Sequence, residues 1–236
     1  MKLGYPLSAS RYWLTGAVMR KSTKRMPKTK PPVVTRPGLL VVLSSPSGAG
    51  KTTVAGALLK REPNLVRSVS CTTRPKRKGE KDGKDYFFVT PAQFRSMIRL
   101  GEFLEWAKVY RNYYGTPKAW IEAQTSRGRD VLFVIDIQGG QALRKARPDA
   151  VRIFLEPPSW RVLVKRLTGR GTEDPEAVRI RLKTAVRELA EAPRYDFRVV
   201  ADRPAWAAAR IGKIIRRARQ SRKIGLFHGK GRRGMV

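Results

Sequence analysis

The chain has 236 residues, of which 41% are hydrophobic, and carries a formal net charge of +33. This length is sufficient for one α/β domain with extensions, and no apolar run approaches the roughly 18 residues of a membrane span. The single cysteine, Cys71, excludes an internal disulfide framework and suits a reducing cytosol, so we expect a cytoplasmic protein. With His228 as the one histidine, there is no case for a structural zinc site.

Much of the positive charge lies in two acid-free ends of the chain. Residues 1–37 hold nine Lys/Arg and residues 203–236 hold eleven. We expect residues 1–37 to be a disordered basic extension, 38–220 the folded domain and 221–236 a basic tail. The leader could instead be an organelle transit peptide, or translation could start at Met19 or Met26. The basic arms could contact polyanions nonspecifically, or could simply be solvated.

Apolar runs alternate with helical patterns along the domain. The first half is predicted to contain a buried strand at 39–43, a helix ending near residue 60, short strands within 67–90 and a helix at 91–100. The second half is predicted to contain strands within 129–139, 150–158 and 196–202, and helices at 159–167, 176–192 and 205–221. Such alternation predicts a parallel, doubly wound α/β sheet that binds its ligand at the carboxyl ends of the strands.

The stretch VVLSSPSGAGKTT (Val41–Thr53) places a glycine-rich loop between the first strand and the first helix. It is close to the phosphate-loop pattern G-x-x-x-x-G-K-[ST], although Ser45 replaces the first glycine. Backbone N–H groups of such a loop cradle a triphosphate, a lysine contacts its phosphates and a hydroxyl binds Mg²⁺. The residues predicted to bind the triphosphate are Ser45, Pro46, Ser47, Gly48, Ala49, Gly50, Lys51 and Thr52. The loop alone does not distinguish ATPases, GTPases and kinases.

Four further blocks follow in order: SVSCTTRPKRKGEKDGKDYFFV, GEFLEWAKVYRNYYGTP, VLFVIDIQGG and RLTGRGTEDPEAVRIRL. With them the chain resembles the guanylate kinase family over about residues 38–220. The resemblance implies a P-loop kinase fold with a GMP-binding segment at about 70–120 and an arginine-rich lid at about 166–181. It also implies the reaction ATP + GMP = ADP + GDP, with Mg²⁺ as cofactor, in purine metabolism and GMP recycling.

The resemblance also assigns roles to individual side chains. Glu105 would read the guanine base, because a carboxylate accepts from two guanine donors that adenine does not offer together, and Thr116 would contact the base. The GMP phosphate would be held by Ser70, Arg74, Arg77, Tyr86 and Tyr114. Asp136 would lie beside GMP and the metal.

The predicted catalytic side chains are cationic, as phosphoryl transfer requires charge neutralisation more than covalent chemistry. They are Lys51, Arg74, Arg166, Arg170 and Arg181. Mg²⁺ would be bound by Thr52, with Asp136 acting through water. No general base is expected, because a phosphate oxygen of GMP is already an anionic nucleophile.

Four positions depart from the family pattern: Ser45 in the loop, Val134 in place of a second acid, Ala201 near the adenine pocket and Arg111 before NYYGT. Of these, Val134 is the one expected to affect the rate. Two other functions remain open from the residues: a kinase-inactive module that binds phosphorylated proteins, and a kinase of a sugar phosphate. The first would lack the loop and lid cations, and the second would not need Glu105 and Thr116.

Overall fold

The computed structural model describes residues 37–109, 111–168 and 175–223. The predicted basic leader up to residue 36, the end of the basic tail and the segment 169–174 lie outside the described residues. The described chain forms two compact units, one of residues 37–68 and 124–223 and the other of residues 69–123. Nowhere in these ranges is a helix both long and apolar enough to cross a membrane.

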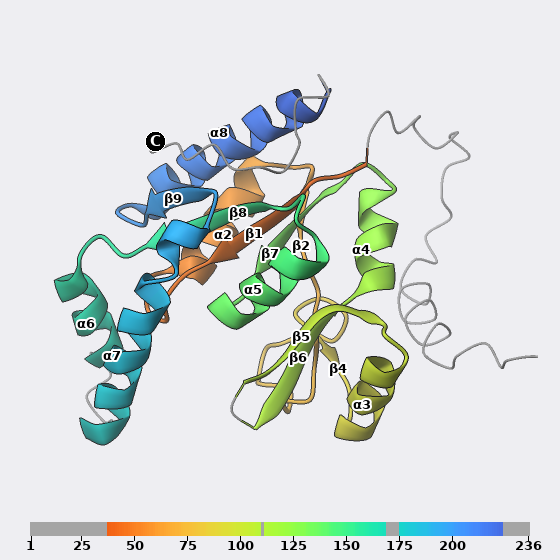
Figure 1. Ribbon diagram of the computed structural model, residues 1–236, viewed down its shortest axis with the longest axis horizontal. Coiled ribbons are helices and arrows are strands. Elements are labelled where there is room, and N and C mark those ends of the chain that lie inside the picture. The colour runs from red at the N-terminus through yellow and green to blue at the C-terminus, as the bar shows by residue number, and fades with distance from the viewer. Residues whose placement is uncertain (1–36, 110, 169–174, 224–236) are drawn as a thin grey trace, which may run out of the picture. The chain divides into compact units, whose positions relative to one another are not determined.

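The first unit is built on a five-stranded sheet in the order β2-β7-β1-β8-β9, in which every neighbouring pair is parallel (Figure 1). The predicted parallel α/β sheet is therefore confirmed. The central strands are buried on both faces, as in other parallel sheets, and so appear as short continuous apolar runs. The strands are β1 (Leu40–Ser44), β2 (Leu65–Arg67), β7 (Asp130–Val134), β8 (Val151–Glu156) and β9 (Phe197–Val200).

Helices pack on both faces of this sheet. Alternate residues of β8 show the two faces: Ile153 and Leu155 belong to the large core under α2 and α8, whereas Phe154 packs with Ile137 of α5. The helices of this unit are α2 (Lys51–Arg61), α5 (Ile137–Ala146), α6 (Trp160–Thr168), α7 (Pro175–Leu189) and α8 (Pro204–Lys223). The amphipathic helix expected at 176–192 ends at Leu189, and a 3₁₀ turn (Ala192–Arg194) containing Pro193 follows it.

An ion-pair cluster fixes the last helix against the sheet. Arg219 of α8 donates from Nη1 to Glu62 Oε2 (2.9 Å) and from Nε to Asp130 Oδ2 (2.5 Å), and Arg216 also pairs with Glu62. Both carboxylate side chains are almost fully buried, and Asp130 also accepts from the backbone N–H of Leu39 (2.7 Å). Because a buried carboxylate is costly without a partner, these arginines are part of the fold and are not simply solvated charge.

The second unit is a four-stranded sheet in the order β4-β3-β6-β5, flanked by α3. Its core stacks Phe94 on Phe103, with ring centroids 4.4 Å apart, and on Tyr113. Cys71 is buried here, and burial raises the pKa of its thiol to about 12, so its environment is that of an unreactive core residue. The elements are β3 (Cys71–Thr72), β4 (Phe87–Phe88), α3 (Pro91–Arg99), β5 (Phe103–Val109) and β6 (Asn112–Pro117), and α4 (Lys118–Thr125) follows β6.

Candidate functional site

The glycine-rich loop has a backbone that glycine makes possible. Gly48 and Gly50 have φ angles of 79° and 98°, in the left-handed region that side chains with a Cβ rarely adopt. Gly50 is the N-cap of α2, so the positive end of the helix dipole lies at the loop. Ser45 is buried, and its hydroxyl donates to the carbonyl of Pro46 (3.0 Å), so its side chain is accommodated in the loop.

Lys51 extends from the first turn of α2 to the end of the neighbouring strand. Its Nζ donates to the carbonyl oxygen of Ile135 at 2.8 Å. Burial lowers the pKa of Lys51, whereas the nearby carboxylates of Asp136 and Glu188 act in the opposite direction. The ammonium group is therefore largely desolvated and held in one place, which strengthens its interaction with a phosphate.

These groups line one pocket of about 470 Å³. Its walls are residues 45–48 and 50–53 of the loop and first helical turn, together with Asp136 and Glu188. The structure thus brings together all but one of the residues predicted to bind the triphosphate. The exception is Ala49, which is buried and whose N–H donates to Pro46 O at 3.2 Å.

Glu188, near the end of α7, was not predicted from the sequence. Its Oε2 accepts from the backbone N–H of Ser47 at 3.3 Å, and burial raises the pKa of its carboxyl group, opposed by Ser47 and Lys51. The carboxylate of Glu188 thus accepts from the N–H group of Ser47, which a bound phosphate would otherwise use. An acid within an amphipathic helix gives no local signal of such a contact, because α7 and the loop are 141 residues apart in the chain.

Asp136 and Thr52, the residues predicted to hold Mg²⁺, both line this pocket. Asp136 is the N-cap of α5, where its Oδ1 accepts from Gly139 N at 2.8 Å, and Thr52 is exposed in the same pocket. In the described residues no cluster of three or more His, Cys, Asp or Glu could hold a metal by itself. A hydroxyl and a carboxylate beside a phosphate pocket do fit Mg²⁺, which commonly keeps several waters and binds substrate phosphates.

The arginines predicted to form a lid differ in their surroundings. Arg166 of α6 donates from Nη1 to the carbonyl oxygens of Gly48 (3.3 Å) and Ala49 (3.1 Å), so it contacts the loop directly. Arg181 is exposed on α7. Arg170, the third predicted lid arginine, lies outside the described residues.

In the second unit, three predicted residues form a hydrogen-bonded chain. The Thr116 hydroxyl donates to Glu105 Oε1 at 2.6 Å and lies 3.1 Å from the hydroxyl of Ser70. Glu105 and Thr116 are direct cross-strand partners in β5 and β6, and both are buried. This pairing fixes the carboxylate of Glu105 in one orientation, which sequence spacing alone could not show.

The predicted phosphate ligands of this unit surround Arg74. Its guanidinium donates to Glu80 Oε1 (2.7 Å) and lies 5.5 Å from the ring centroid of Tyr86, which itself packs edge-on against Tyr114. The hydrogen bond with Glu80 raises the pKa of Arg74 and lowers that of Glu80. Arg77 has an exposed side chain, and its backbone N–H donates to Glu80 (2.8 Å). Glu80 was not predicted as a site residue, although it is one of only two acids, with Asp82, in the basic loop RPKRKGEKDGK.

The other departures from the family pattern lie in ordinary structural surroundings. Val134 packs against the main core at the end of β7. Ala201 is buried, and its N–H donates to Glu156 O at 2.7 Å. Arg111 is exposed between β5 and β6. No effect of these three residues on the reaction follows from their contacts.

Comparison with known proteins gives a consistent result. The family model for guanylate kinase matches residues 38–218. The chain is 50% identical to a guanylate kinase of Novosphingobium aromaticivorans over 195 residues, 81% of this chain and 88% of that protein. It is 49% identical to a guanylate kinase of Symbiobacterium thermophilum over 178 residues, covering 75% and 84% of the two chains.

A solved structure shows the same similarity. The crystal structure of guanylate kinase from Anaplasma phagocytophilum matches with a TM-score of 0.63 and 38% identity, over 78% of this chain and 87% of that chain. Sequence and fold agree over most of the chain, and the glycine-rich loop has a lysine and two glycines at positive φ. The chain therefore belongs to the guanylate kinase family of phosphotransferases.

Proposed function

We propose that this protein transfers the γ-phosphoryl group of ATP to GMP, giving ADP and GDP, and that the reaction requires Mg²⁺. A phosphate oxygen of GMP forms a bond to the γ-phosphorus while the bond from that phosphorus to the β,γ-bridging oxygen breaks. The attacking oxygen is already ionised, so the reaction needs no general base. The contribution of the protein is to position the phosphates and to neutralise their charge.

The donor phosphates are assigned to the pocket of the first unit. The loop N–H groups and Lys51 offer donors and a positive charge, and the backbone at Gly48 and Gly50 allows close approach. Mg²⁺ bound by Thr52, with Asp136 acting through water, would neutralise charge on the phosphates when the nucleotide is bound. Arg166, Arg170 and Arg181 are proposed to stabilise the transferring phosphoryl group.

The acceptor is assigned mainly from the buried pair of Glu105 and Thr116, which is the observation that carries this proposal. Thr116 donates to one carboxylate oxygen and so orients Glu105. A carboxylate fixed in this way can accept from N1–H and the 2-amino group of guanine, whereas adenine has an acceptor at N1 and lacks the 2-amino group. Since an unpaired buried polar group is costly, the pair is expected to select GMP over AMP strongly.

The phosphate of GMP is assigned to the group around Arg74. An arginine presents a fork of N–H donors that matches a phosphate bidentately, and Ser70, Arg77, Tyr86 and Tyr114 are proposed to add further donors. Arg74 would exchange its hydrogen bond with Glu80 for one with the phosphate, a substitution between two anions.

The activity is tested with a coupled assay that measures ADP release from Mg-ATP with GMP, AMP, CMP or UMP as acceptor. We expect turnover with GMP far above that with the other three. Lys51→Ala should abolish turnover with any acceptor, while Lys60→Ala, an exposed lysine of the same helix, should leave it unchanged. Absence of GMP-dependent turnover, or a Lys51→Ala variant with near-normal rate, would contradict the proposal.

The proposal includes a place for the reaction in the cell. Phosphorylation of GMP would serve purine metabolism and the recycling of GMP, and we propose that it occurs in the cytosol. Support comes from the similarity to bacterial guanylate kinases and from a cysteine content that suits a reducing compartment. Fractionation of cells that express the untagged protein would test this location.

A further inference from the structure

A second cavity, of about 410 Å³, lies in the first unit between α5, β8 and the turn that follows α7. It is similar in size to the phosphate pocket, at about 470 Å³, but shares none of its lining residues. Its apolar part includes the ring of Tyr195, which packs edge-on against Phe154. Both cavity volumes fall in the range of small-molecule sites.

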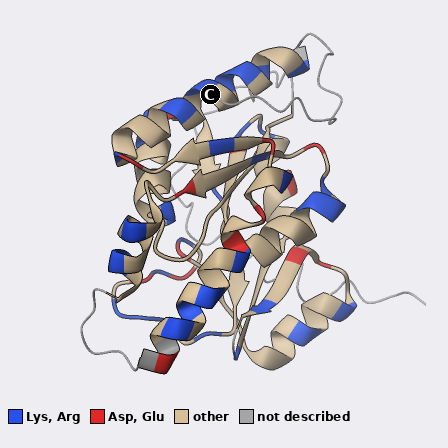
Figure 2. Ribbon diagram, turned by 60° about the vertical axis from the view of Figure 1, so that its left-hand side comes forward, with Lys and Arg blue, Asp and Glu red and all other residues tan. Residues whose placement is uncertain are grey.

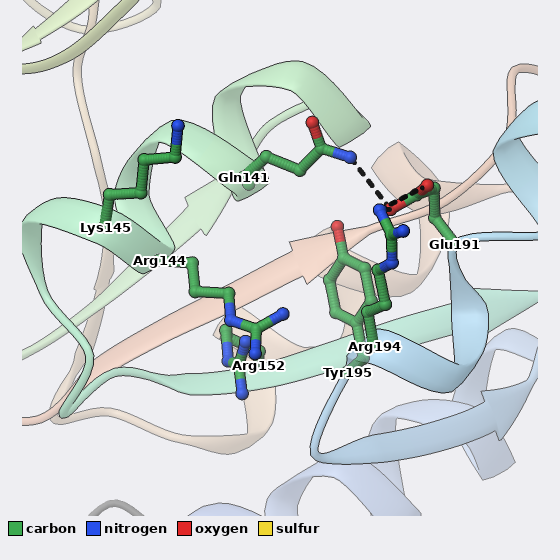
Figure 3. Close-up of a pocket in the computed structure, with 8 residues that line it drawn as sticks. Gln141, Arg144, Lys145, Arg152, Glu191, Arg194 and Tyr195 are labelled. Atoms are coloured by element: carbon green, nitrogen blue, oxygen red, sulfur yellow. Dashed lines mark hydrogen bonds and ion pairs between the residues drawn. The ribbon is translucent and has the colours of Figure 1, made fainter.

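Cationic side chains converge on this cavity from three separate elements. Figure 3 shows Arg144 pointing from α5 toward Arg152 of β8, with Arg194 beside Tyr195 in the turn. Lys145 also lines the cavity, and among the described residues Glu191 is the one carboxylate that does. The phosphate pocket, by comparison, has Lys51 against two carboxylates. By formal charge, the second cavity is therefore the more attractive of the two for an anion.

The four cations differ in how far they are already neutralised. Arg152 pairs with Asp196 through its side chain and its backbone N–H, and Arg194 pairs with Glu191 at 2.9 Å. Arg144 and Lys145 form no ion pair within the described part of the chain. Arg144 and Lys145 therefore provide uncompensated positive charge at the cavity. Arg152 and Arg194 are held in place by their ion pairs.

A solvated basic surface would give a different pattern. Lys and Arg are spread over most helices of this protein (Figure 2). Here a helix, a strand and a turn place three arginines and one lysine around a single cavity, with Arg144 and Lys145 of α5 exposed to solvent at its edge. Guanidinium forks match phosphate oxygens in geometry as well as in charge.

We propose that this cavity is a second anion site, which binds a small phosphate-bearing ligand through Arg144 and Lys145. Arg152 and Arg194 support the ligand from the far wall, and the hydrogen bond from Gln141 Nε2 to Glu191 Oε2 (2.8 Å) keeps the one carboxylate turned to its own partners. The site is distinct from the substrate pockets, so it goes beyond the proposed reaction and does not depend on it.

The proposal is tested by titrating the ¹⁵N-labelled full-length protein with pyrophosphate at physiological salt, which screens weak surface binding. We expect two sets of backbone amides to shift: the loop amides of Gly48 and Gly50, and the cavity amides of Gly140 and Gln141. A parallel titration with ADP distinguishes a bare phosphate chain from the phosphate tail of a nucleotide. If ADP also shifts the cavity amides, the site accepts nucleotide phosphates.

The test variant is Arg144→Gln/Lys145→Gln, because neither side chain forms a hydrogen bond or ion pair with the residues that the structure describes. Loss of charge-assisted contacts should weaken binding at the cavity by about tenfold or more, with the loop amides titrating as before. The matched control is Lys213→Gln/Arg217→Gln, which removes the same charge from exposed positions of α8. It should leave both sets of shifts unchanged.

Three results would overturn the proposal. The cavity amides could fail to respond to millimolar pyrophosphate in the wild-type protein. They could respond equally in the Arg144→Gln/Lys145→Gln variant. The control pair could weaken binding as much as the cavity pair does, in which case the general positive charge of the protein accounts for the effect.

Discussion

Replacing Glu105 by glutamine removes one charge and one acceptor from the proposed base-reading group without changing its size. Glu105 is 8% exposed, and its Oε1 accepts from the Thr116 hydroxyl at 2.6 Å. In the variant the amide oxygen can still accept from Thr116. Its NH₂ group then faces the base, where guanine presents two donors. At least one donor of guanine is therefore left without an acceptor in either orientation of the amide.

The magnitude follows from the hydrogen bond that is lost. A hydrogen bond to a charged group contributes roughly 1.5–3 kcal/mol, so kcat/KM for GMP should fall roughly 10- to 100-fold. The low rate with AMP should not fall and can rise, because the new NH₂ group can donate to N1 of adenine. Selectivity, expressed as the ratio of the two kcat/KM values, should therefore fall by at least the same factor as the GMP reaction.

The assay is steady-state ADP release with GMP and AMP as competing acceptors, at saturating Mg-ATP. Glu122→Gln, an exposed carboxylate of α4, is the control for a change of charge in the same unit. Thermal unfolding of both variants checks that the fold is retained. If the Glu105→Gln variant keeps kcat/KM for GMP within about threefold of the wild type, a base-reading role for Glu105 is wrong.

Further predictions concern the fold, the loop and the thiol. Arg219→Met deprives two buried carboxylates of their shared partner, and should lower the free energy of unfolding by about 3 kcal/mol and Tm by about 6–12 °C in calorimetry, whereas exposed Arg217→Met should not. Glu188→Gln keeps an acceptor for Ser47 but removes a negative charge from the phosphate pocket, so KM for ATP should fall with kcat unchanged. The carboxyl pKa is raised, so wild-type ATP affinity should decline as pH rises through that pKa, and a variant with the same decline would contradict this explanation. Cys71, with a pKa of about 12, should react with iodoacetamide at pH 8 only after denaturation; rapid labelling of the native protein, measured by mass spectrometry, would show that the thiol is accessible.

Local sequence patterns were sufficient to predict those elements whose residues carry a clear strand, loop or helix signal. The apolar runs of β1, β7 and β8 predicted the parallel sheet, and the pattern of the glycine-rich loop identified most of the residues that line its pocket. Helix α3 was predicted within one residue of its end, since Gly101 follows it in the left-handed conformation (φ 63°). The strands β5 and β6 and the helix α5 were not predicted. The strands mix polar and aromatic residues, and α5 contains two consecutive glycines, which are poor helix formers.

By itself, the sequence determined the fold class, the phosphate loop and the family, because these depend on residue types at fixed spacing along the chain. Tertiary structure decided which side chains meet across long separations. It joined Glu105 to Thr116 across a strand pair, directed Lys51 to the backbone carbonyl of Ile135 just after β7, and brought Glu188 to the loop. A backbone oxygen has no signature in the sequence, and an acid on a helix has the same letter whether it faces solvent or a phosphate pocket. These contacts exist only once the sheets and helices have packed, which is why they could not be read from spacing.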